Sequence, residues 1–357
     1  MKILIDAMSA EYGGIRTYVE QLLGHWHLAF PDDEIHVALA SGATLATGPH
    51  VRHELVVRRP AVLGRPWAQT RELSRIVETV GAEVVLATMP STTMRNPGCP
   101  VVVVVHDLRH QLRPEQFSAA RRLMRRVAYG RAYSVADAFV SVSHRTADDL
   151  ARCQPSTTAK PGVVAHHGAD HVLEWPTADR SGPAMAFAHH SNKNPGLILE
   201  AWAIMAKHAA PPPILIVGLG AEGRAVLQPM VESLRLEPYV ELAAYLPDHE
   251  FQQAMARANM IIFPSDFEGF GLPVVEGMTL GKPVVIGPDE GTTEVAGGHA
   301  VVMTDWSAEA LADAAVAAGR MSDQALETAR TWGAGYTWNR SVRQTRDILD
   351  RLASSRS

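Results

Sequence analysis

The sequence predicts an α/β fold of two domains, each with a parallel sheet covered by helices. Short apolar runs alternate with amphipathic stretches along the chain, which is the order expected of parallel sheets. One run, residues 101–105, is five consecutive valines, typical of a strand buried on both faces. The chain has 357 residues, whereas a single hydrophobic core rarely grows beyond about 250–300 residues. We therefore expect two domains.

In the first half, a strand expected at residues 2–7 is followed by a glycine-bearing turn and a helix at 15–26. The other elements expected there are a strand at 34–40, a helix at 67–81, strands at 82–88 and 100–107, a helix at 115–136 and a strand at 138–143. The stretch 166–184 then breaks the rhythm, because it contains Gly, Pro, Asp and Ser but no periodic apolar face. We interpret it as the linker.

The alternation restarts after the linker. The elements expected in the second half are strands at 184–190, 213–220, 240–246, 260–265, 282–287 and 299–305, and helices at 194–208, 222–236, 248–259 and 272–281. A last amphipathic helix is expected at 338–352. We expect an N-terminal domain at 1–170, a second domain at 171–336, and a C-terminal helix in 337–357 that packs back toward the first domain.

Composition excludes several classes of protein. A formal charge of −5 and a pI of about 6.3 leave no basic footprint for nucleic acid. Two cysteines, Cys99 and Cys153, make no disulfide framework, which favours a reducing cytoplasm. The N-terminal apolar run is too short for a signal peptide, and no run reaches the roughly 18 apolar residues of a membrane span. We expect a cytoplasmic protein.

One local excess of charge stands out, the arginines of residues 121–131. The residues concerned are Arg121, Arg122, Arg125, Arg126 and Arg131. The simpler interpretation is a solvated helix face. The alternative is a basic helix that rests on anionic lipid, at the inner face of the membrane, or that binds a phosphorylated acceptor.

The stretch "DFEGFGLPVVEG", residues 266–277, has one acid on each side of a glycine-bearing turn, Glu268 and Glu276. Pro273 suits the first turn of a helix, and Gly269 and Gly271 allow the backbone to approach a ligand closely. The free N–H groups of such a helix start bind anions such as a diphosphate. From the first turn of that helix Glu276 could reach a diol such as a ribose, while Glu268 precedes the glycines. The alternative is a simple capped helix with a solvated Glu276.

The segment "PSDFEGFGLPVVEGMTLGKPVV" resembles the E-x7-E segment of the retaining glycosyltransferases of family 4, which have the GT-B fold. That fold consists of two Rossmann-like domains that face each other across a cleft, with an acceptor domain first and a nucleotide-sugar donor domain second. The resemblance implies that Glu268 contacts hydroxyls of the donor sugar and that Glu276 binds the ribose. It also implies that the backbone from Gly269 through Phe270, Gly271 and Leu272 lies by the sugar and diphosphate.

Other stretches resemble the same family in the same order, so the resemblance covers nearly the whole chain. "YGGIRTYVEQLL" is similar to its N-terminal glycine turn, which implies that Gly13 and Gly14 face the diphosphate; alone, this stretch would indicate a plain turn. "VVVVVHDL" resembles a strand that ends in a histidine, which implies that His106 lies near the donor sugar. The alternative for His106 is a purely structural residue.

One departure concerns the family's Arg–Lys pair, which contacts the diphosphate. In "AFAHHSNKNPGLILEAW", Lys193 matches the lysine, but Asn192 stands at the arginine position after His189 and His190. A neutral amide cannot replace a permanently charged planar fork. Phosphate binding would then depend more on Lys193 and helix N-termini, or on a protonated histidine.

Competing functions have weaker support. Gly218, Gly220 and Gly223 form a G-x-G-x-x-G after a strand, which would indicate NAD binding, but Glu241 lies too early in the next strand to bind a ribose. Asp266 with Glu268 could bind a metal, although the resemblance implies that protein groups neutralise the diphosphate. No G-x-S-x-G elbow is present. A non-catalytic sugar-nucleotide-binding protein is the alternative of another class.

We therefore expect a retaining, metal-independent hexosyltransferase without a cofactor. The resemblance implies a nucleotide-diphosphate donor, with mannose or rhamnose favoured, and a glycan, lipid-linked or small-molecule acceptor. His106, Glu268 and Lys193 are the expected catalytic residues. Because no residue is placed as a covalent nucleophile, front-face substitution is expected, with the leaving phosphate accepting the acceptor's proton.

Overall fold

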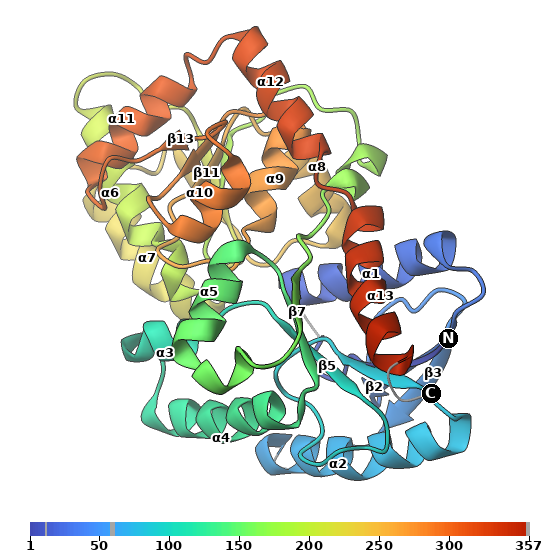
Figure 1. Cartoon of the computed structure of the whole chain (residues 1–357). Helices are drawn as coiled ribbons and strands as arrows, with labels where there is room; N and C mark the ends of the chain where they lie inside the picture. Colours follow the sequence, from blue (N-terminus) through green and yellow to red (C-terminus); the bar gives the residue numbers. More distant parts are fainter. Residues whose placement is uncertain (11–12, 58–60, 355–357) are drawn as a thin grey trace. The chain divides into compact units, whose positions relative to one another are not determined.

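The computed structural model describes residues 1–10, 13–57 and 61–354. The chain divides into two compact units, Met1–Gly168 with the C-terminal helix from Trp338, and Ala169–Thr337. Each unit contains one fully parallel sheet with helices around it (Figure 1). The prediction of two parallel-sheet α/β domains is therefore confirmed.

The first unit contains a seven-stranded sheet of order β3-β2-β1-β4-β5-β6-β7. The strands are β1 Lys2–Asp6, β2 Glu34–Ala40, β3 Val51–Leu55, β4 Val84–Ala87, β5 Val101–Val105, β6 Ala138–Ser141 and β7 Gly162–Val164. The helices are α1 Gly13–Ala29, α2 Ala61–Val80, α3 Arg109–Leu112, α4 Ala119–Val135, α5 His144–Cys153 and α13 Trp338–Ser354, with short 3-10 turns at Pro114–Gln116 and Pro155–Thr157. All five valines of β5 are fully buried, as the sequence predicts.

The second unit contains a six-stranded sheet of order β10-β9-β8-β11-β12-β13. The strands are β8 Ala184–Phe187, β9 Ile214–Val217, β10 Val240–Leu242, β11 Ile261–Phe263, β12 Val284–Ile286 and β13 Val301–Val302. The helices are α6 Pro195–Ala206, α7 Ala221–Ser233, α8 Asp248–Arg257, α9 Leu272–Thr279, α10 Glu290–Ala296, α11 Ala308–Ala318 and α12 Asp323–Ala334, with 3-10 turns η3 Asp170–Glu174 and η4 Ser191–Lys193.

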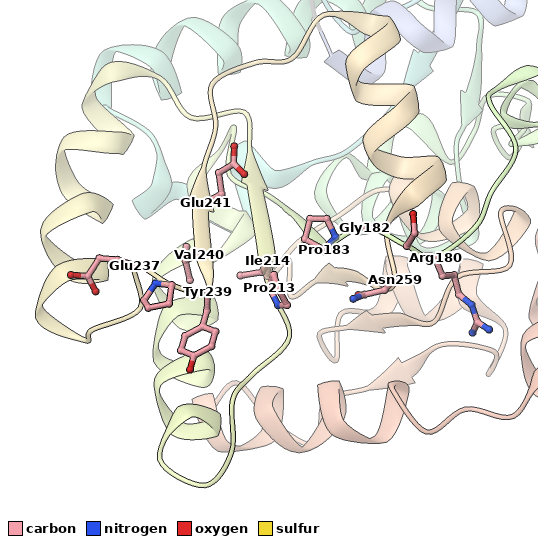
Figure 2. A pocket seen from close by; sticks show the side chains of 12 residues that line it. Arg180, Gly182, Pro183, Pro213, Ile214, Glu237, Tyr239, Val240, Glu241 and Asn259 are labelled. Atoms are coloured by element: carbon pink, nitrogen blue, oxygen red, sulfur yellow. The ribbon is translucent and has the colours of Figure 1, made fainter.

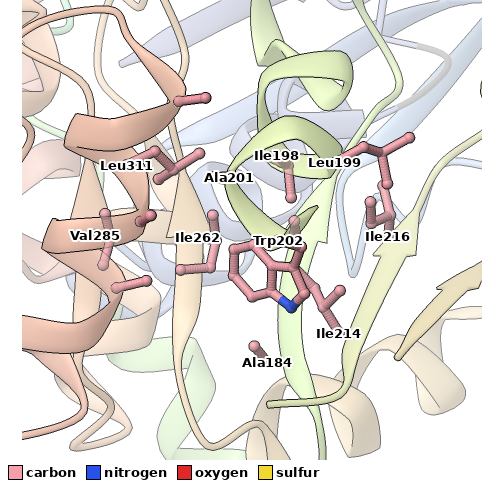
Figure 3. Close-up of a cluster of buried hydrophobic side chains, with 14 of the residues drawn as sticks. Ala184, Ile198, Leu199, Ala201, Trp202, Ile214, Ile216, Ile262, Val285 and Leu311 are labelled. Atoms are coloured by element: carbon pink, nitrogen blue, oxygen red, sulfur yellow. The ribbon is translucent and has the colours of Figure 1, made fainter. Parts of the chain in front are cut away.

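A buried core on one face of the second sheet fixes the strands whose ends bear the candidate site. Figure 3 shows Trp202 of α6 beside Ile214 of β9, Ala184 of β8 and Ile262 of β11. Trp202 is fully buried, and its indole N–H donates to Pro212 O at 2.8 Å. Burying an aromatic side chain of this size contributes about 2–3 kcal/mol. This packing holds strands β8, β9 and β11 together at one end of the loops that carry the candidate site.

The C-terminal helix belongs to the first unit, where α13 lies beside α1 (Figure 1). Asp33 anchors it: its carboxylate accepts from Arg346 Nε at 3.2 Å, from Trp26 Nε1 at 3.1 Å and from the N-terminal ammonium at 3.0 Å. Trp338 is fully buried at the start of α13. The N-terminal ammonium and helix α13 thus share one carboxylate partner.

Several described elements were not expected from the sequence, among them strands β3 and β7 and helices α5, α10, α11 and α12, and one expected helix is divided. Strand β3 was not expected, because Val51–Leu55 is an edge strand with mostly exposed residues and no clear alternation. The single helix expected at 115–136 is divided, since Ser118 adopts extended backbone and its Oγ caps the first turn of α4 by accepting from Arg121 N. None of the described helices is long and apolar enough to cross a membrane.

Candidate functional site

The loop between β11 and α9 shows why glycine and proline stand where they do. Gly271 adopts a left-handed backbone with φ of 93° immediately before α9, a conformation that costs most other residues free energy. Pro273 occupies the first turn, where its missing N–H is no loss. The N–H groups at this helix start therefore lie where the sequence places an anion site.

Glu268 precedes this helix start, and three polar groups hold its carboxylate. Its Oε1 forms an ion pair with Lys193 Nζ and accepts a hydrogen bond from Ser265 Oγ. The same oxygen lies 2.9 Å from Asn192 Nδ2. No described residue hydrogen-bonds to Oε2, and the Glu268 side chain is 17% exposed. The acid is thus rigidly held through one oxygen and presents the other.

Asn192 holds the loop that carries Glu268 through its side chain and its backbone. It is buried, and its amide nitrogen lies 2.8 Å from Ser265 Oγ and 3.0 Å from Phe267 O as well as close to Glu268. In return, Asn192 O accepts from Asp266 N at 2.9 Å. The residue at the family's arginine position therefore builds the Glu268 loop.

Lys193 is fixed from a second side. Its ammonium lies 4.2 Å from the centre of the Phe263 ring, a cation–π arrangement, and the residue is buried in η4 at the carboxyl end of β8. A lysine held by an acid and an aromatic face loses little side-chain freedom when it meets an anion. Such preorganisation is what electrostatic stabilisation requires.

Glu276 lies in α9, and the partner of its carboxylate is His171 of η3. His171 Nε2 donates to Glu276 Oε1 at 3.2 Å, and both side chains are only 6% exposed. As with Glu268, no described residue hydrogen-bonds to Oε2. Glu268 thus lies in a polar, partly exposed environment, whereas Glu276 is buried beside an imidazole.

Two further glycines allow the close packing of this region. A Cβ at Gly291, in α10, would lie 2.2 Å from Glu268 O, so only glycine lets α10 approach the Glu268 loop. A Cβ at Gly277 would lie 2.9 Å from Ile261 Cγ1, so α9 packs directly on β11. The positions of both acids therefore depend on these two glycines as well.

His106, in the first unit, follows β5 and is held by neutral contacts. Its Nε2 donates to Thr88 O at 2.9 Å, and its ring packs against Tyr18 at 4.9 Å and His167 at 5.5 Å between centroids. Burial lowers the pKa of His106 from 6.5 to about 4. The neutral ring therefore keeps Nδ1 as a hydrogen-bond acceptor near neutral pH.

Gly13 and Gly14 begin α1 and are exposed. Gly13 has φ of 61°, which explains the choice of glycine at this turn. The preceding Tyr12, part of the glycine-turn resemblance, lies outside the described residues. The helix thus begins at Gly13, two residues earlier than expected, and both exposed glycines lie in its first turn.

The formal dinucleotide fingerprint is placed differently from an NAD site. Gly218 has φ of 87° and Gly220 caps α7, so the glycines do form a turn after β9. Glu241, however, is the middle residue of β10 and lines a hollow of about 620 Å³ (Figure 2). This hollow also includes Pro183 and Ile214 at the starts of β8 and β9, so it opens at the amino edge of the sheet. Ligands of such sheets bind at the opposite, carboxyl edge.

Two residues of the site were not found from the sequence. Ser265 comes directly after β11, and its position between a strand and Glu268 is a signal that could have been used. His171 lies 105 residues before Glu276, and no local pattern connects them. The sequence pattern places His171 in the expected linker and indicates no contact with α9.

Two family models match the chain, one in each half of the sequence. The family model "Glycosyltransferase Family 4" matches residues 12–173, and the model "Glycosyl transferases group 1" matches residues 187–327. Together they cover most of both units.

Two curated relatives match shorter segments. The chain is 33% identical over 90 residues to the O-antigen chain mannosyltransferase B of Escherichia coli, which is 25% of this chain and 24% of that protein. It is 29% identical over 124 residues to the putative colanic acid biosynthesis glycosyltransferase WcaL of Salmonella typhimurium, which is 32% of this chain and 30% of that protein. The matches thus span less than a third of each relative.

Solved structures match over the whole chain. HepE from Anabaena, in complex with UDP and glucose, superposes with a TM-score of 0.74 at 19% identity and covers 99% of this chain and 100% of that one. Sucrose-phosphate synthase from Thermosynechococcus elongatus gives a TM-score of 0.75 at 16% identity, again covering 99% and 100%. At these identities the likeness concerns the fold.

Proposed function

The chain belongs to the glycosyltransferases of family 4 and has the GT-B fold, and we propose that it transfers a hexose with retention of configuration. The donor is a nucleotide-diphosphate sugar, and the acceptor is a glycan, a lipid-linked glycan or a small molecule. The observation behind this proposal is the pair of acids around the α9 start, each fixed through one oxygen.

The second unit binds the donor in this proposal. The N–H groups at the start of α9 receive the diphosphate, with the ribose on the Glu276 side and the sugar on the Glu268 side. Lys193 and the helix dipole offset the charge that develops on the departing phosphate. With these groups in place, the reaction needs no metal ion, so an excess of EDTA should leave the transfer rate unchanged.

Substitution takes place on the front face of the sugar. Glu268 is fixed by three donors that converge on its Oε1. It therefore orients the sugar, and the leaving phosphate accepts the proton of the acceptor hydroxyl. His106 accepts a hydroxyl hydrogen through Nδ1 in its neutral form. A trapped glycosyl-enzyme adduct would contradict this mechanism.

Mannose is our first choice for the sugar and rhamnose the second. The segment shared with the Escherichia coli mannosyltransferase supports mannose. Thermal shift with a panel of nucleotide sugars identifies the donor, since a ligand at 100 times its Kd stabilises the folded state by about 2.7 kcal/mol. Transfer to an acceptor, followed by NMR of the product's anomeric centre, tests retention. A product of inverted configuration would refute the proposal.

A peripheral membrane contact through α4 is the second part of the proposal. Arg122 and Arg126 are exposed on α4, and Leu123 and Val127 beside them are 63% and 55% exposed. Arg125 differs, because it lies over the Phe117 ring at 4.8 Å. The helix contains no acidic residue, so its charge complements an anionic lipid surface.

Co-sedimentation with vesicles tests this contact. We expect binding to phosphatidylglycerol vesicles that salt weakens, and little binding to phosphatidylcholine vesicles. The double variant Leu123→Ser and Val127→Ser should lose most of the binding, while exchange of exposed Val226 of α7 for Ser serves as the control. Binding that is equal on both vesicle types would refute an electrostatic contact.

A further inference from the structure

His171 is a buried imidazole that the mechanism above does not use. It lies in η3, at the beginning of the second unit, and donates from Nε2 to Glu276 Oε1 at 3.2 Å. We propose that His171 is a positioning residue that holds the Glu276 carboxylate toward the donor's ribose. This inference rests on the proposed function, in which Glu276 binds that ribose.

The imidazole is itself held in place. Its ring meets Trp175 edge to face at a centroid distance of 5.5 Å and an interplanar angle of 81°. Trp175 in turn packs against Phe251 of α8 at 6.0 Å. The backbone of η3 is fixed as well, because Ala169 N donates to Tyr336 O at 2.8 Å and Val172 N to Ala169 O at 3.2 Å. His171 therefore presents its Nε2 from a rigid support.

Glu276 needs such a partner for physical reasons. A carboxylate that is 6% exposed loses most of its hydration, and without a hydrogen-bond partner its burial would cost free energy. Among the described residues, His171 supplies the hydrogen bond to this carboxylate. Because that bond uses Oε1, Oε2 is left to accept from hydroxyls of a ligand. A ribose, with two adjacent hydroxyls, is the group that this oxygen suits.

The same hydrogen bond could serve only to attach η3 to α9. The two roles differ in what they do to ligand discrimination. If His171 positions Glu276, replacing it weakens the binding of ligands that have ribose hydroxyls and leaves the binding of ligands without them unchanged. An attachment role lowers the melting temperature and affects both kinds of ligand equally.

The experiment measures the affinity of the full chain for UDP, GDP and ADP and for their 2′,3′-dideoxy counterparts by calorimetry. The variants are His171→Phe, which removes the donor, and His171→Gln, which keeps an N–H donor. Exchange of His249 for Phe, at an exposed position of α8 with a side chain 72% exposed, is the matched control. The melting temperature of each variant is recorded alongside.

We expect the wild type to prefer the ribose form of its nucleotide about ten-fold, the effect of one or two hydrogen bonds to a charged group. His171→Phe should weaken the binding of the ribose form alone, so that the ratio of the two affinities falls close to one. His171→Gln should keep most of the wild-type preference. In transfer assays His171→Phe should raise the donor KM and leave kcat within about two-fold.

Two results would overturn the inference. If the wild type discriminates and His171→Phe keeps the full preference, Glu276 needs no positioning by His171, and the proposed function stands. If the wild type binds none of the diphosphates, or binds both forms equally, the ribose assignment fails together with the inference.

Discussion

Glu268 and Glu276 stand in one short segment, yet the structure holds them in different ways. Glu268 is partly exposed and gathers an ammonium, a hydroxyl and an amide on one oxygen. Glu276 is buried and relies on an imidazole from η3. In the proposed function, the first arrangement acts where charge changes during the reaction, and the second holds one acceptor for a neutral diol. Similar residues at a fixed spacing can thus have dissimilar tasks.

The sharpest test of this comparison is Glu268→Gln. The change keeps the shape but removes the charge that pairs with Lys193, so we expect kcat to fall about 10²–10³-fold. The donor KM should change little, because the nucleotide half of the site is intact. Steady-state kinetics measure both, with Glu309→Gln on the exposed face of α11 as control. An unchanged kcat would show that Glu268 is misassigned.

Asn192→Leu tests whether the polar support of Glu268 is as strong as its contacts indicate. The variant leaves Ser265 Oγ and Phe267 O without the buried amide, so the free energy of unfolding should fall by about 1–3 kcal/mol. Chemical denaturation measures this loss. Exchange of Asn339, partly exposed on α13, for Leu is the control. A loss equal to that of the control would mean that Asn192 is dispensable.

Glu276→Gln addresses the other half of the comparison. An amide oxygen accepts a weaker hydrogen bond than a carboxylate, so we expect the donor KM to rise about ten-fold while kcat changes little. Initial rates at varied donor concentration separate the two constants. Should kcat fall as steeply as in Glu268→Gln, the division of tasks between the acids would be wrong.

The smallest expected effect concerns the first unit, where burial rather than charge fixes the candidate residue. Burial lowers the pKa of His106 and of His110 from 6.5 to about 4 and that of His167 well below 6.5. The unfolded chain therefore binds more protons than the folded chain between pH 6.5 and 4. The contribution of these histidines to the free energy of unfolding is thus complete above pH 6.5 and is lost progressively as the pH falls. Burial raises the pKa of Asp6 to about 6, and its contribution runs in the opposite direction, being lost as the pH rises through 6.

As the pH falls, the stability lost through the three histidines exceeds the stability gained through Asp6. His106 is partly exposed, which reduces its share of that loss. The net result should be a fall in the free energy of unfolding between pH 7 and 4.5. Denaturant titrations at the two pH values measure it. His110→Phe should flatten the dependence, and a stability that rises on acidification would contradict the assigned directions.

Much of the segment 266–277 could be predicted from the sequence, because its signals are local. Gly271 and Pro273 mark a helix start after an apolar strand, and the structure has Gly271 in a left-handed conformation directly before α9. Strand β3 could not be predicted, since an exposed edge strand shows no buried face. The helix expected at 115–136 failed at Ser118, a capping signal that the apolar and basic pattern obscured.

What the sequence determined by itself was the parallel α/β architecture and the position of both acids around a glycine turn, because periodicity and backbone preference act over a few residues. What only the tertiary structure decided was the surroundings of each acid. Asn192 and Lys193 meet Glu268 across 75 residues or more, and His171 meets Glu276 across 105. Such contacts arise when strands assemble side by side, and the order of strands in a sheet is not contained in any local pattern.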